Sequence, residues 1–176
     1  MAKNLKVVLL GYMASGKSTI GKSLSQKLGV SFLDLDNEIE KDVEMTVPEI
    51  FEKKGELFFR KKEAEVLQRL LAEREEGFVL ALGGGTPCYG KNMEIVNSNT
   101  QNTFYIKLTV VDLVERIVNE KQQRPLVANI ADEDLMEFVG KHLFERNPFY
   151  AKASHIIDSR KASVDEVVKQ IEGLLV

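Results

Sequence analysis

The sequence has few of the residues on which several protein classes depend. Its 176 residues include one cysteine, Cys88, four prolines and no tryptophan, so an intrachain disulfide framework is excluded. No stretch approaches the roughly 18 to 20 consecutive apolar residues that a membrane-spanning helix needs. Neither end carries a secretory or lipidation signal. From these absences we expect a cytoplasmic protein without a membrane partner.

Basic charge is not in excess either. Lys and Arg number 24 against 27 Asp and Glu, which gives a formal net charge of -3 and does not favour binding to nucleic acid. Hydrophobic residues make up 44% of the chain and charged residues 29%, proportions typical of a folded globular domain. We therefore expect a single domain over residues 1–176 that has no nucleic-acid partner. It has no long apolar face, which favours a monomer.

Short apolar runs alternate with longer segments of helical periodicity. The runs predict strands over Leu5 to Leu10, Ser31 to Leu33, Phe78 to Leu82, Thr103 to Leu108 and His155 to Asp158. The periodic segments predict helices over Lys17 to Leu28, Asn37 to Val43, Pro48 to Lys54, Glu56 to Leu71, Lys91 to Val96, Val111 to Glu120, Asp134 to Arg146 and Val164 to Leu174. Continuous apolar strands suit a parallel sheet covered by helices on both faces. The pattern predicts a three-layer α/β domain.

Two breaks in this pattern carry further expectations. Asn147-Pro148 is expected to stop the helix that carries Arg146, because proline cannot donate a backbone hydrogen bond. The polar segment from Asn119 to Asp134 lacks periodicity and predicts a long mobile loop. Such a loop is either a functional lid or a disordered surface segment.

The strongest motif follows the first predicted strand. Gly11-Tyr12-Met13-Ala14-Ser15-Gly16-Lys17-Ser18-Thr19 matches the phosphate-loop pattern G-x-x-x-x-G-K-[ST] and runs directly into a predicted helix. Its glycines let backbone N–H groups point at phosphate oxygens near the positive end of the helix. Lys17 supplies a countercharge for the β- and γ-phosphates, and the Ser18 hydroxyl can coordinate Mg²⁺. The alternative is a strand-to-helix turn that binds nothing.

Acidic and glycine-rich segments end the next two predicted strands. In Phe32-Leu33-Asp34-Leu35-Asp36 the two aspartates, two residues apart, project to the same side of an extended chain. One can act near Mg²⁺ and the other near a substrate hydroxyl, unless Asp36 or Asn37 only caps the following helix. The run Gly83-Gly84-Gly85 indicates a backbone that approaches a ligand closely, or an ordinary flexible turn.

Two arginines each lie at the end of the apolar face of a predicted helix. Arg60 shares a helix face with Leu67, and Arg146 shares one with Leu143. A guanidinium there suits a small anion, an internal carboxylate, or a side chain that reaches out to water. Arg124, in the predicted lid, would add a third positive charge. His142, His155 and Cys88 are interpreted as structural residues.

Taken together, the chain resembles shikimate kinase. The resemblance rests on the phosphate loop, Phe32-Leu33-Asp34-Leu35-Asp36, Arg60, Gly83-Gly84-Gly85, Arg124-Pro125-Leu126 and Arg146-Asn147-Pro148-Phe149-Tyr150, in that order across nearly the whole chain. It implies a P-loop kinase fold with a central five-stranded parallel sheet of order 2-3-1-4-5 and a mobile lid. The lid would cover about residues 112–134, and a shikimate-binding helical region about residues 34–62.

The resemblance also implies a reaction and a role for each site residue. The γ-phosphate of ATP would pass to the 3-hydroxyl of shikimate, with Mg²⁺ as cofactor, in a step toward chorismate and the aromatic amino acids. Lys17, Asp36 and Arg124 would be catalytic; Asp36, Arg60, Gly83, Gly84, Gly85 and Arg146 would bind shikimate; Ser18 and Asp34 would hold the metal. ATP would contact Gly11, Ala14, Ser15, Gly16, Lys17, Ser18, Thr19, Arg116, Arg124 and Arg160.

Two other functions remain open at this point. Another small-molecule kinase, such as a gluconate kinase, would share the phosphate loop but have a different acceptor pocket. A non-catalytic nucleotide-binding switch would bind ATP without releasing ADP when an acceptor is added.

Overall fold

A five-stranded parallel sheet forms the centre of the molecule. The computed structural model describes residues 4–121, 124 and 126–176. The strands are β1 (Lys6–Leu10), β2 (Ser31–Asp34), β3 (Phe78–Ala81), β4 (Thr103–Lys107) and β5 (His155–Asp158). Their order is β2-β3-β1-β4-β5, and every neighbouring pair is parallel. The predicted fold class and strand order are confirmed.

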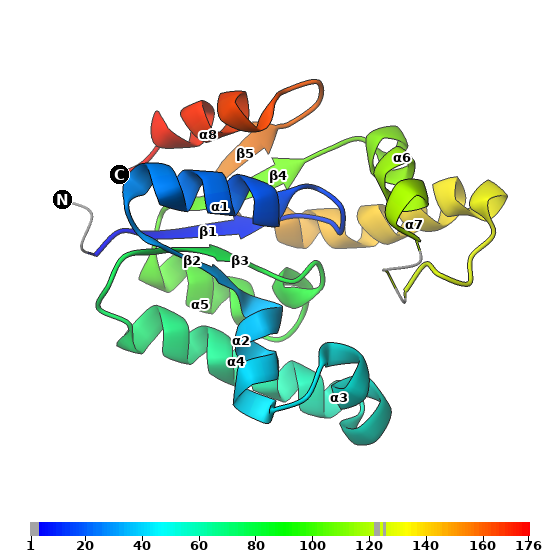
Figure 1. Cartoon of the computed structure of the whole chain (residues 1–176), viewed down its shortest axis with the longest axis horizontal. Coiled ribbons are helices and arrows are strands. Elements are labelled where there is room, and N and C mark those ends of the chain that lie inside the picture. The colour runs from blue at the N-terminus through cyan, green and yellow to red at the C-terminus, as the bar shows by residue number, and fades with distance from the viewer. Residues whose placement is uncertain (1–3, 122–123, 125) are drawn as a thin grey trace.

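Helices cover both faces of this sheet. They are α1 (Lys17–Leu28), α2 (Leu35–Val43), α3 (Val47–Lys54), α4 (Glu56–Glu73), the short 3₁₀ turn η1 (Thr86–Cys88), α5 (Asn92–Asn99), α6 (Val110–Glu120), α7 (Asp132–Tyr150) and α8 (Val164–Glu172). Figure 1 shows α1 and α8 on one face, and α4 and α5 on the other. Helices α6 and α7 lie toward the carboxyl ends of the strands, whereas both chain termini lie at the opposite end (Figure 1).

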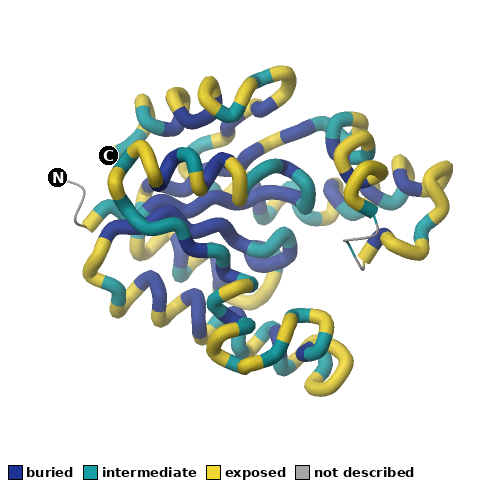
Figure 2. The backbone as a smooth tube through the Cα atoms, viewed as in Figure 1, coloured by how far each residue is buried: buried dark blue, intermediate teal, exposed yellow. Residues whose placement is uncertain are grey.

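The strands β1, β3 and β4 are continuously apolar because each of them contributes side chains to two cores. In β1, Val7 and Leu9 pack with α1 and α8, whereas Val8 and Leu10 pack with the helices of the other face. All four side chains are fully buried. Figure 2 shows the same division, with a buried sheet between helices that expose their outer sides. Burial on both faces is what a parallel sheet between two helical layers requires.

The helix predicted from Asn37 begins two residues earlier, at Leu35. The second strand therefore ends at Asp34, and Asp36 lies in the first turn of α2. Asp34 accepts hydrogen bonds from the backbone N–H groups of Asp36 and Asn37, at 3.0 and 3.3 Å. This cap satisfies N–H groups that would otherwise lack partners at the helix start, so the chain turns sharply after β2.

The predicted stop at Asn147-Pro148 is wrong, because α7 continues to Tyr150 with Pro148 inside it. Proline removes one backbone hydrogen bond close to the end of the helix, and tertiary contacts hold the last turn. The Tyr150 hydroxyl donates to the Gly84 carbonyl at 2.6 Å. The Tyr105 hydroxyl donates to Asn147 Oδ1 at 3.0 Å.

The connection between α6 and α7 includes the predicted lid. Its described residues between Lys121 and Ala131 form turns, whereas Gln122, Gln123 and Pro125 lie outside the described residues. The side chain of Val127 is fully buried in the larger core. This part of the connection is therefore packed against the domain. In the described chain, no helix combines the length and apolar character needed to cross a membrane.

We expect the core to respond to truncation at Leu67 and not at Leu57, two leucines of α4. Leu67 is fully buried, so Leu67→Ala should lower the free energy of unfolding by about 3 kcal/mol through lost burial and the cavity left behind. Leu57 is 72% exposed, so Leu57→Ala should change it by less than about 0.5 kcal/mol. Urea unfolding measures both, and equal losses would contradict the assigned packing of α4.

Candidate active site

The phosphate loop joins the carboxyl end of β1 to the start of α1. Gly11 has a φ of 152°, and a Cβ there would lie 2.7 Å from the Ile106 carbonyl oxygen. Gly16 has a φ of 92°, and Ala14 adopts the left-handed region at 61°. The loop thus needs glycine at two positions for conformation and space. It also stores some backbone strain at Ala14, as functional loops often do.

Lys17, at the start of α1, points back into this loop. Its Nζ donates to the carbonyl oxygens of Gly11 and Tyr12, at 2.8 and 2.9 Å. Burial is the main cause that lowers the pKa of Lys17 to about 8, and the nearby positive charge of Arg124 adds to it. A cation that is desolvated and held only by neutral oxygens favours a nearby anion. The geometry therefore suits a phosphate group.

Asp34 and Ser18 form a small oxygen-rich corner beside the loop. The Ser18 hydroxyl donates to Asp34 Oδ2 at 3.3 Å, while Asp34 Oδ1 caps α2. Within the described residues there is no cluster of three or more His, Cys, Asp or Glu side chains arranged for a metal ion. One carboxylate and one hydroxyl suit Mg²⁺, which keeps several waters and takes phosphate oxygens as further ligands.

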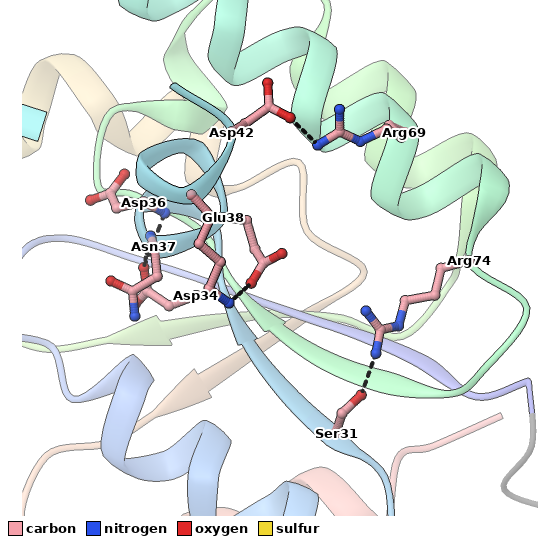
Figure 3. Close-up of polar contacts among 9 residues, drawn as sticks. Ser31, Asp34, Asp36, Asn37, Glu38, Asp42, Arg69 and Arg74 are labelled. Carbon is pink, nitrogen blue, oxygen red and sulfur yellow. Dashed lines mark hydrogen bonds and ion pairs between the residues drawn. The ribbon is translucent and has the colours of Figure 1, made fainter. Parts of the chain in front are cut away.

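Asp36 lies two residues after Asp34, in the first turn of α2. The expectation that both aspartates project from an extended strand is wrong, because Asp36 is helical. The capping interpretation holds for Asp34 instead of Asp36. Burial, followed by the neighbouring charges of Asp34 and Glu63, raises the pKa of Asp36 to about 6. In Figure 3 the Asp36 carboxylate has no partner among the residues drawn.

The glycine run after β3 provides space for charged side chains. A Cβ at Gly83 would lie 3.2 Å from Asp36 Oδ1, and one at Gly84 would lie 3.2 Å from Arg146 Nη1. A Cβ at Gly85 would lie 2.9 Å from Arg60 Nη2 and 3.4 Å from Arg146 Nη2. None of the three glycines, all of them described, has a left-handed φ. Gly84 and Gly85 leave room for guanidinium groups, and Gly83 leaves room for the Asp36 carboxylate.

Arg60 reaches this run from α4, with 17% of its side chain exposed. Its Nη1 donates to the buried carboxylate of Glu63 at 2.9 Å, and its guanidinium lies 3.8 Å from the centre of the Tyr89 ring. Glu63 also accepts a hydrogen bond from the Thr86 hydroxyl at 2.7 Å. The internal carboxylate considered above therefore exists for Arg60, and it fixes the guanidinium beside Gly85.

Arg146 reaches the same glycines from α7. Its guanidinium lies 5.7 Å from the centre of the Tyr12 ring. Within the described part of the chain, Arg60 forms ion pairs with Glu56 and Glu63, whereas Arg146 forms none. Two guanidinium groups thus converge on Gly85 with incomplete neutralisation, an arrangement that favours an added carboxylate or phosphate.

A cavity of about 590 Å³ connects most of these groups. It is lined by Met13, Ala14, Ser15, Gly16, Lys17, Ser18, Thr19, Asp34, Asp36, Leu82, Gly83, Gly84, Arg116, Glu120 and Arg124. Arg116 donates to the Ala14 carbonyl at 3.2 Å, and Arg124 is paired with Glu120. Both arginines therefore face the phosphate loop, as expected of residues that contact a nucleotide.

Arg160 is the one predicted site residue in the described chain that lies apart. It pairs with Asp158 after β5, where its Nε donates to Oδ1 at 2.9 Å. The cavity of about 260 Å³ that it lines contains Lys107, Leu108 and Thr109, and no phosphate-loop residue. Its contact with ATP remains a prediction.

A larger cavity, of about 890 Å³, lies at the amino ends of the strands and shares no residue with the phosphate loop. Its cations are engaged within the protein: Lys6 donates to the Leu71 carbonyl at 2.6 Å, and Arg74 donates to the Ser31 hydroxyl at 3.1 Å. Figure 3 shows the Arg74 contact. A ligand site at the carboxyl ends of the strands, where the loops converge, is therefore better supported than one in this larger cavity.

The roles of three residues of the site were missed by the sequence analysis, although two of them, Tyr12 and Tyr150, stand in the motifs quoted above. Glu63 pairs with Arg60, Tyr150 donates to the Gly84 carbonyl, and Tyr12 lies beneath Arg146. Only Glu63 had a usable signal, since it follows Arg60 by three residues on the same helix. The two tyrosines act across long sequence separations.

Comparison with known proteins agrees with this geometry. The family model described as shikimate kinase matches residues 13–175. Curated shikimate kinases of Flavobacterium psychrophilum and Flavobacterium johnsoniae are 46% and 42% identical to this chain over 170 residues. Each alignment covers 97% of this chain and 98% of the relative.

Solved structures give the same result. Shikimate kinase from Bacteroides thetaiotaomicron superposes with a TM-score of 0.89 at 34% identity, and the match covers 97% of each chain. Shikimate kinase from Acinetobacter baumannii in complex with shikimate superposes with a TM-score of 0.84 at 32% identity, covering 98% of this chain and 93% of that one.

The raised pKa of Asp36 predicts a gain in stability when its charge is removed. The folded state disfavours the ionised carboxylate, so Asp36 destabilises the protein increasingly as pH rises from about 4 to about 6, and the loss stays constant at higher pH. Asp36→Asn should therefore raise the free energy of unfolding at pH 8 by on the order of 2 kcal/mol, and by little at pH 4.

Urea unfolding at pH 4 and pH 8 measures this change, and Asp42, on the same helix, is the matched control. Hydrogen bonds from Arg69 and Lys62 lower the pKa of Asp42, so Asp42→Asn should reduce stability at pH 8. A loss of stability in Asp36→Asn at pH 8 would contradict the assigned electrostatics.

Proposed function

Because the chain belongs to the shikimate kinase family, we propose that its substrates bind at the carboxyl ends of β1 and β3, with ATP in the cavity and the acceptor between Asp36 and the adjoining Arg60 and Arg146, which do not line the cavity. The chain is an ATP-dependent kinase that acts on a hydroxyl of shikimate. The family match decides against a gluconate kinase and a non-catalytic switch. One observation carries the assignment of the acceptor end: Arg60 and Arg146 converge on Gly85 close to Asp36.

Arg60 and Arg146 bind the carboxylate of shikimate. Arg60 pairs with both Glu56 and Glu63, whereas Arg146 has no ion pair in the described chain, so the positive charge of Arg146 is the one left for a ligand. A planar guanidinium can bind a carboxylate through two parallel hydrogen bonds. Gly83 and Gly84 line the cavity beside them and offer backbone groups to the hydroxyls, and Gly85 lies against both guanidinium groups.

Asp36 binds the 3-hydroxyl and accepts its proton as the hydroxyl oxygen attacks the γ-phosphate. With a pKa raised to about 6, Asp36 is mostly ionised at neutral pH and is still a better proton acceptor than an ordinary aspartate. The oxygen–phosphorus bond to the acceptor forms as the bond to ADP breaks, which gives shikimate 3-phosphate and ADP. Gly83 leaves the space that the Asp36 carboxylate occupies.

The phosphate loop, from Gly11 to Thr19, binds the phosphates of ATP. Lys17 exchanges its carbonyl contacts for phosphate oxygens, and Arg124 neutralises charge on the transferring group. Arg116 adds a further cation beside Ala14, and Arg160 is assigned to the nucleotide farther from the loop. Ser18 and Asp34 would hold Mg²⁺, which would supply positive charge to the phosphate groups when bound.

Other parts of the chain serve this site. Residues 112–134, which include most of α6, are the lid, and residues 34–62 form the shikimate-binding region. Support for the lid is that Arg116 and Arg124, both within it, already line the cavity. Support for a monomer is that one chain supplies every group named in the reaction.

The reaction is tested by measuring ADP release from the purified protein with Mg·ATP and one acceptor at a time. We expect release with shikimate, and none above background with gluconate or nucleoside monophosphates, because the family to which the chain belongs acts on shikimate. Release with another acceptor alone would keep the kinase and reject the acceptor pocket. Binding of ATP without release by any acceptor would reject the kinase.

Truncation of either arginine tests the carboxylate contact. Arg60→Ala and Arg146→Ala should each raise the KM for shikimate about 30-fold or more, since breaking a partly buried charge pair costs at least about 2 kcal/mol. The KM for ATP should stay within about threefold. Arg69→Ala is the control, because Arg69 shares α4 with Arg60 but pairs with Asp42 (Figure 3). Equal rises in both KM values would overturn the assignment.

The pH profile tests Asp36 as the proton acceptor. In the native enzyme, kcat/KM for shikimate should fall about tenfold per pH unit below an apparent pKa near 6, because only ionised Asp36 takes the proton. Asp36→Asn should lower kcat by roughly 10² to 10⁴. A flat profile down to pH 5, or a variant with nearly native kcat, would show that Asp36 is not the base.

A further inference from the structure

Tyr12 is an unusual member of the phosphate loop because its large side chain is buried. Only 1% of Tyr12 is exposed, and the ring belongs to the core on the α7 side of the sheet. Its backbone carbonyl accepts a hydrogen bond from Lys17 Nζ at 2.9 Å. Tyr12 therefore has its backbone at the nucleotide end of the site and its side chain in the core beneath the acceptor end.

The hydroxyl of Tyr12 is hydrogen-bonded to a histidine of α7. It lies 2.9 Å from His142 Nδ1, and the two rings meet edge to face at 5.5 Å between centres. Burial raises the pKa of Tyr12 to about 12, so the hydroxyl keeps its proton. Burial, with the charge of Arg146, lowers the pKa of His142. A neutral imidazole with its proton on Nε2 accepts the hydrogen bond of the hydroxyl at Nδ1, and this is the tautomer that the inference requires.

Arg146 lies one helical turn beyond His142 on α7, above the face of the Tyr12 ring. The guanidinium carbon is 5.7 Å from the ring centre, within the range of a cation–π contact. The chain described here offers Arg146 no ion pair, unlike Arg60, which Glu63 holds in place. The position of Arg146 therefore depends on the ring beneath it and on the Tyr150 hydroxyl beside it.

We propose that Tyr12 and His142 are positioning residues that set the Arg146 guanidinium for the substrate carboxylate. The hydroxyl–imidazole hydrogen bond fixes the Tyr12 ring against α7, and the ring supports the guanidinium above Gly84 and Gly85. His142, interpreted from the sequence as merely structural, thereby acts on substrate binding through Tyr12. This inference rests on the proposed function, in which Arg146 binds the carboxylate of shikimate.

Steady-state kinetics on the full chain tests the proposal through single substitutions. Tyr12→Phe removes only the hydroxyl, and His142→Leu removes its acceptor. Each should raise the KM for shikimate roughly tenfold, which corresponds to about 1.4 kcal/mol, with the KM for ATP within about twofold because the Tyr12 carbonyl is kept. His142→Asn places an amide oxygen near the former Nδ1 and should stay within about threefold of the native KM.

Phe138→Leu is the matched control for lost aromatic packing. Phe138 contacts the His142 ring at 5.4 Å between centres, from one turn earlier on α7, and touches neither Tyr12 hydroxyl nor Arg146 in the contacts described. It should lower the thermal midpoint of unfolding without changing the KM for shikimate. A rise in KM for Phe138→Leu equal to that for His142→Leu would overturn the proposal, because packing alone would then explain the effect.

Two double variants separate this inference from the function on which it rests. Tyr12→Phe combined with His142→Leu should be no worse than either single variant, because both remove the same hydrogen bond. Tyr12→Phe added to Arg146→Ala should cost nothing further. If Arg146→Ala raises the KM for shikimate but Tyr12→Phe leaves it within twofold, only the positioning role fails. If Arg146→Ala has no effect, the proposed carboxylate contact itself fails.

A spectroscopic measurement reports on the hydrogen bond directly. The chain has two histidines, His142 and His155, so ring ¹⁵N signals are readily assigned with a His155→Gln variant. We expect a predominantly Nε2–H tautomer for His142 at pH 7.5, and a shift toward a tautomer mixture in Tyr12→Phe. An unchanged His142 spectrum in Tyr12→Phe would overturn the proposed hydrogen bond.

Discussion

Two partly buried cations that form no ion pair in the described chain, Lys17 and Arg146, lie at the carboxyl ends of β1 and β3. Lys17 is surrounded by carbonyl oxygens, and Arg146 has no carboxylate partner in the described chain, while Glu63 alone offsets Arg60 among the buried acids. Desolvated cations of this kind weaken the free protein. They also favour anionic ligands, which can replace the missing negative charge. Binding of phosphate and carboxylate groups follows from this imbalance.

The fold makes the imbalance possible by bringing distant segments to one edge of the sheet. The strand order places the ends of β1, β2 and β3 side by side, so the phosphate loop, Asp36 and the glycine run meet there. Helices α4 and α7 then direct one arginine each toward the same glycines. For Asp36 the ionised form is the unfavourable one, because burial next to other carboxylates raises its pKa to about 6. The ionised Asp36 carboxylate lowers the free energy of unfolding, and its raised pKa makes it a better proton acceptor.

The features that the sequence could predict are those with local patterns. The apolar runs predict the strands, and the phosphate-loop spacing predicts the β1–α1 turn with Lys17 at the helix start. Features that depend on tertiary contacts were not predictable in this way. Asp34, not Asp36, caps α2, since a cap is chosen by backbone geometry. Helix α7 passes Pro148 because Tyr150 is anchored at Gly84, 66 residues away in sequence.

The charge imbalance is tested most directly by comparing shikimate with its uncharged methyl ester by isothermal titration calorimetry. The account predicts that the native protein binds the ester at least tenfold more weakly, which corresponds to about 1.4 kcal/mol. It also predicts that a variant combining Arg60→Ala with Arg146→Ala binds both compounds equally. Equal affinity of the native protein for the acid and the ester would contradict the account.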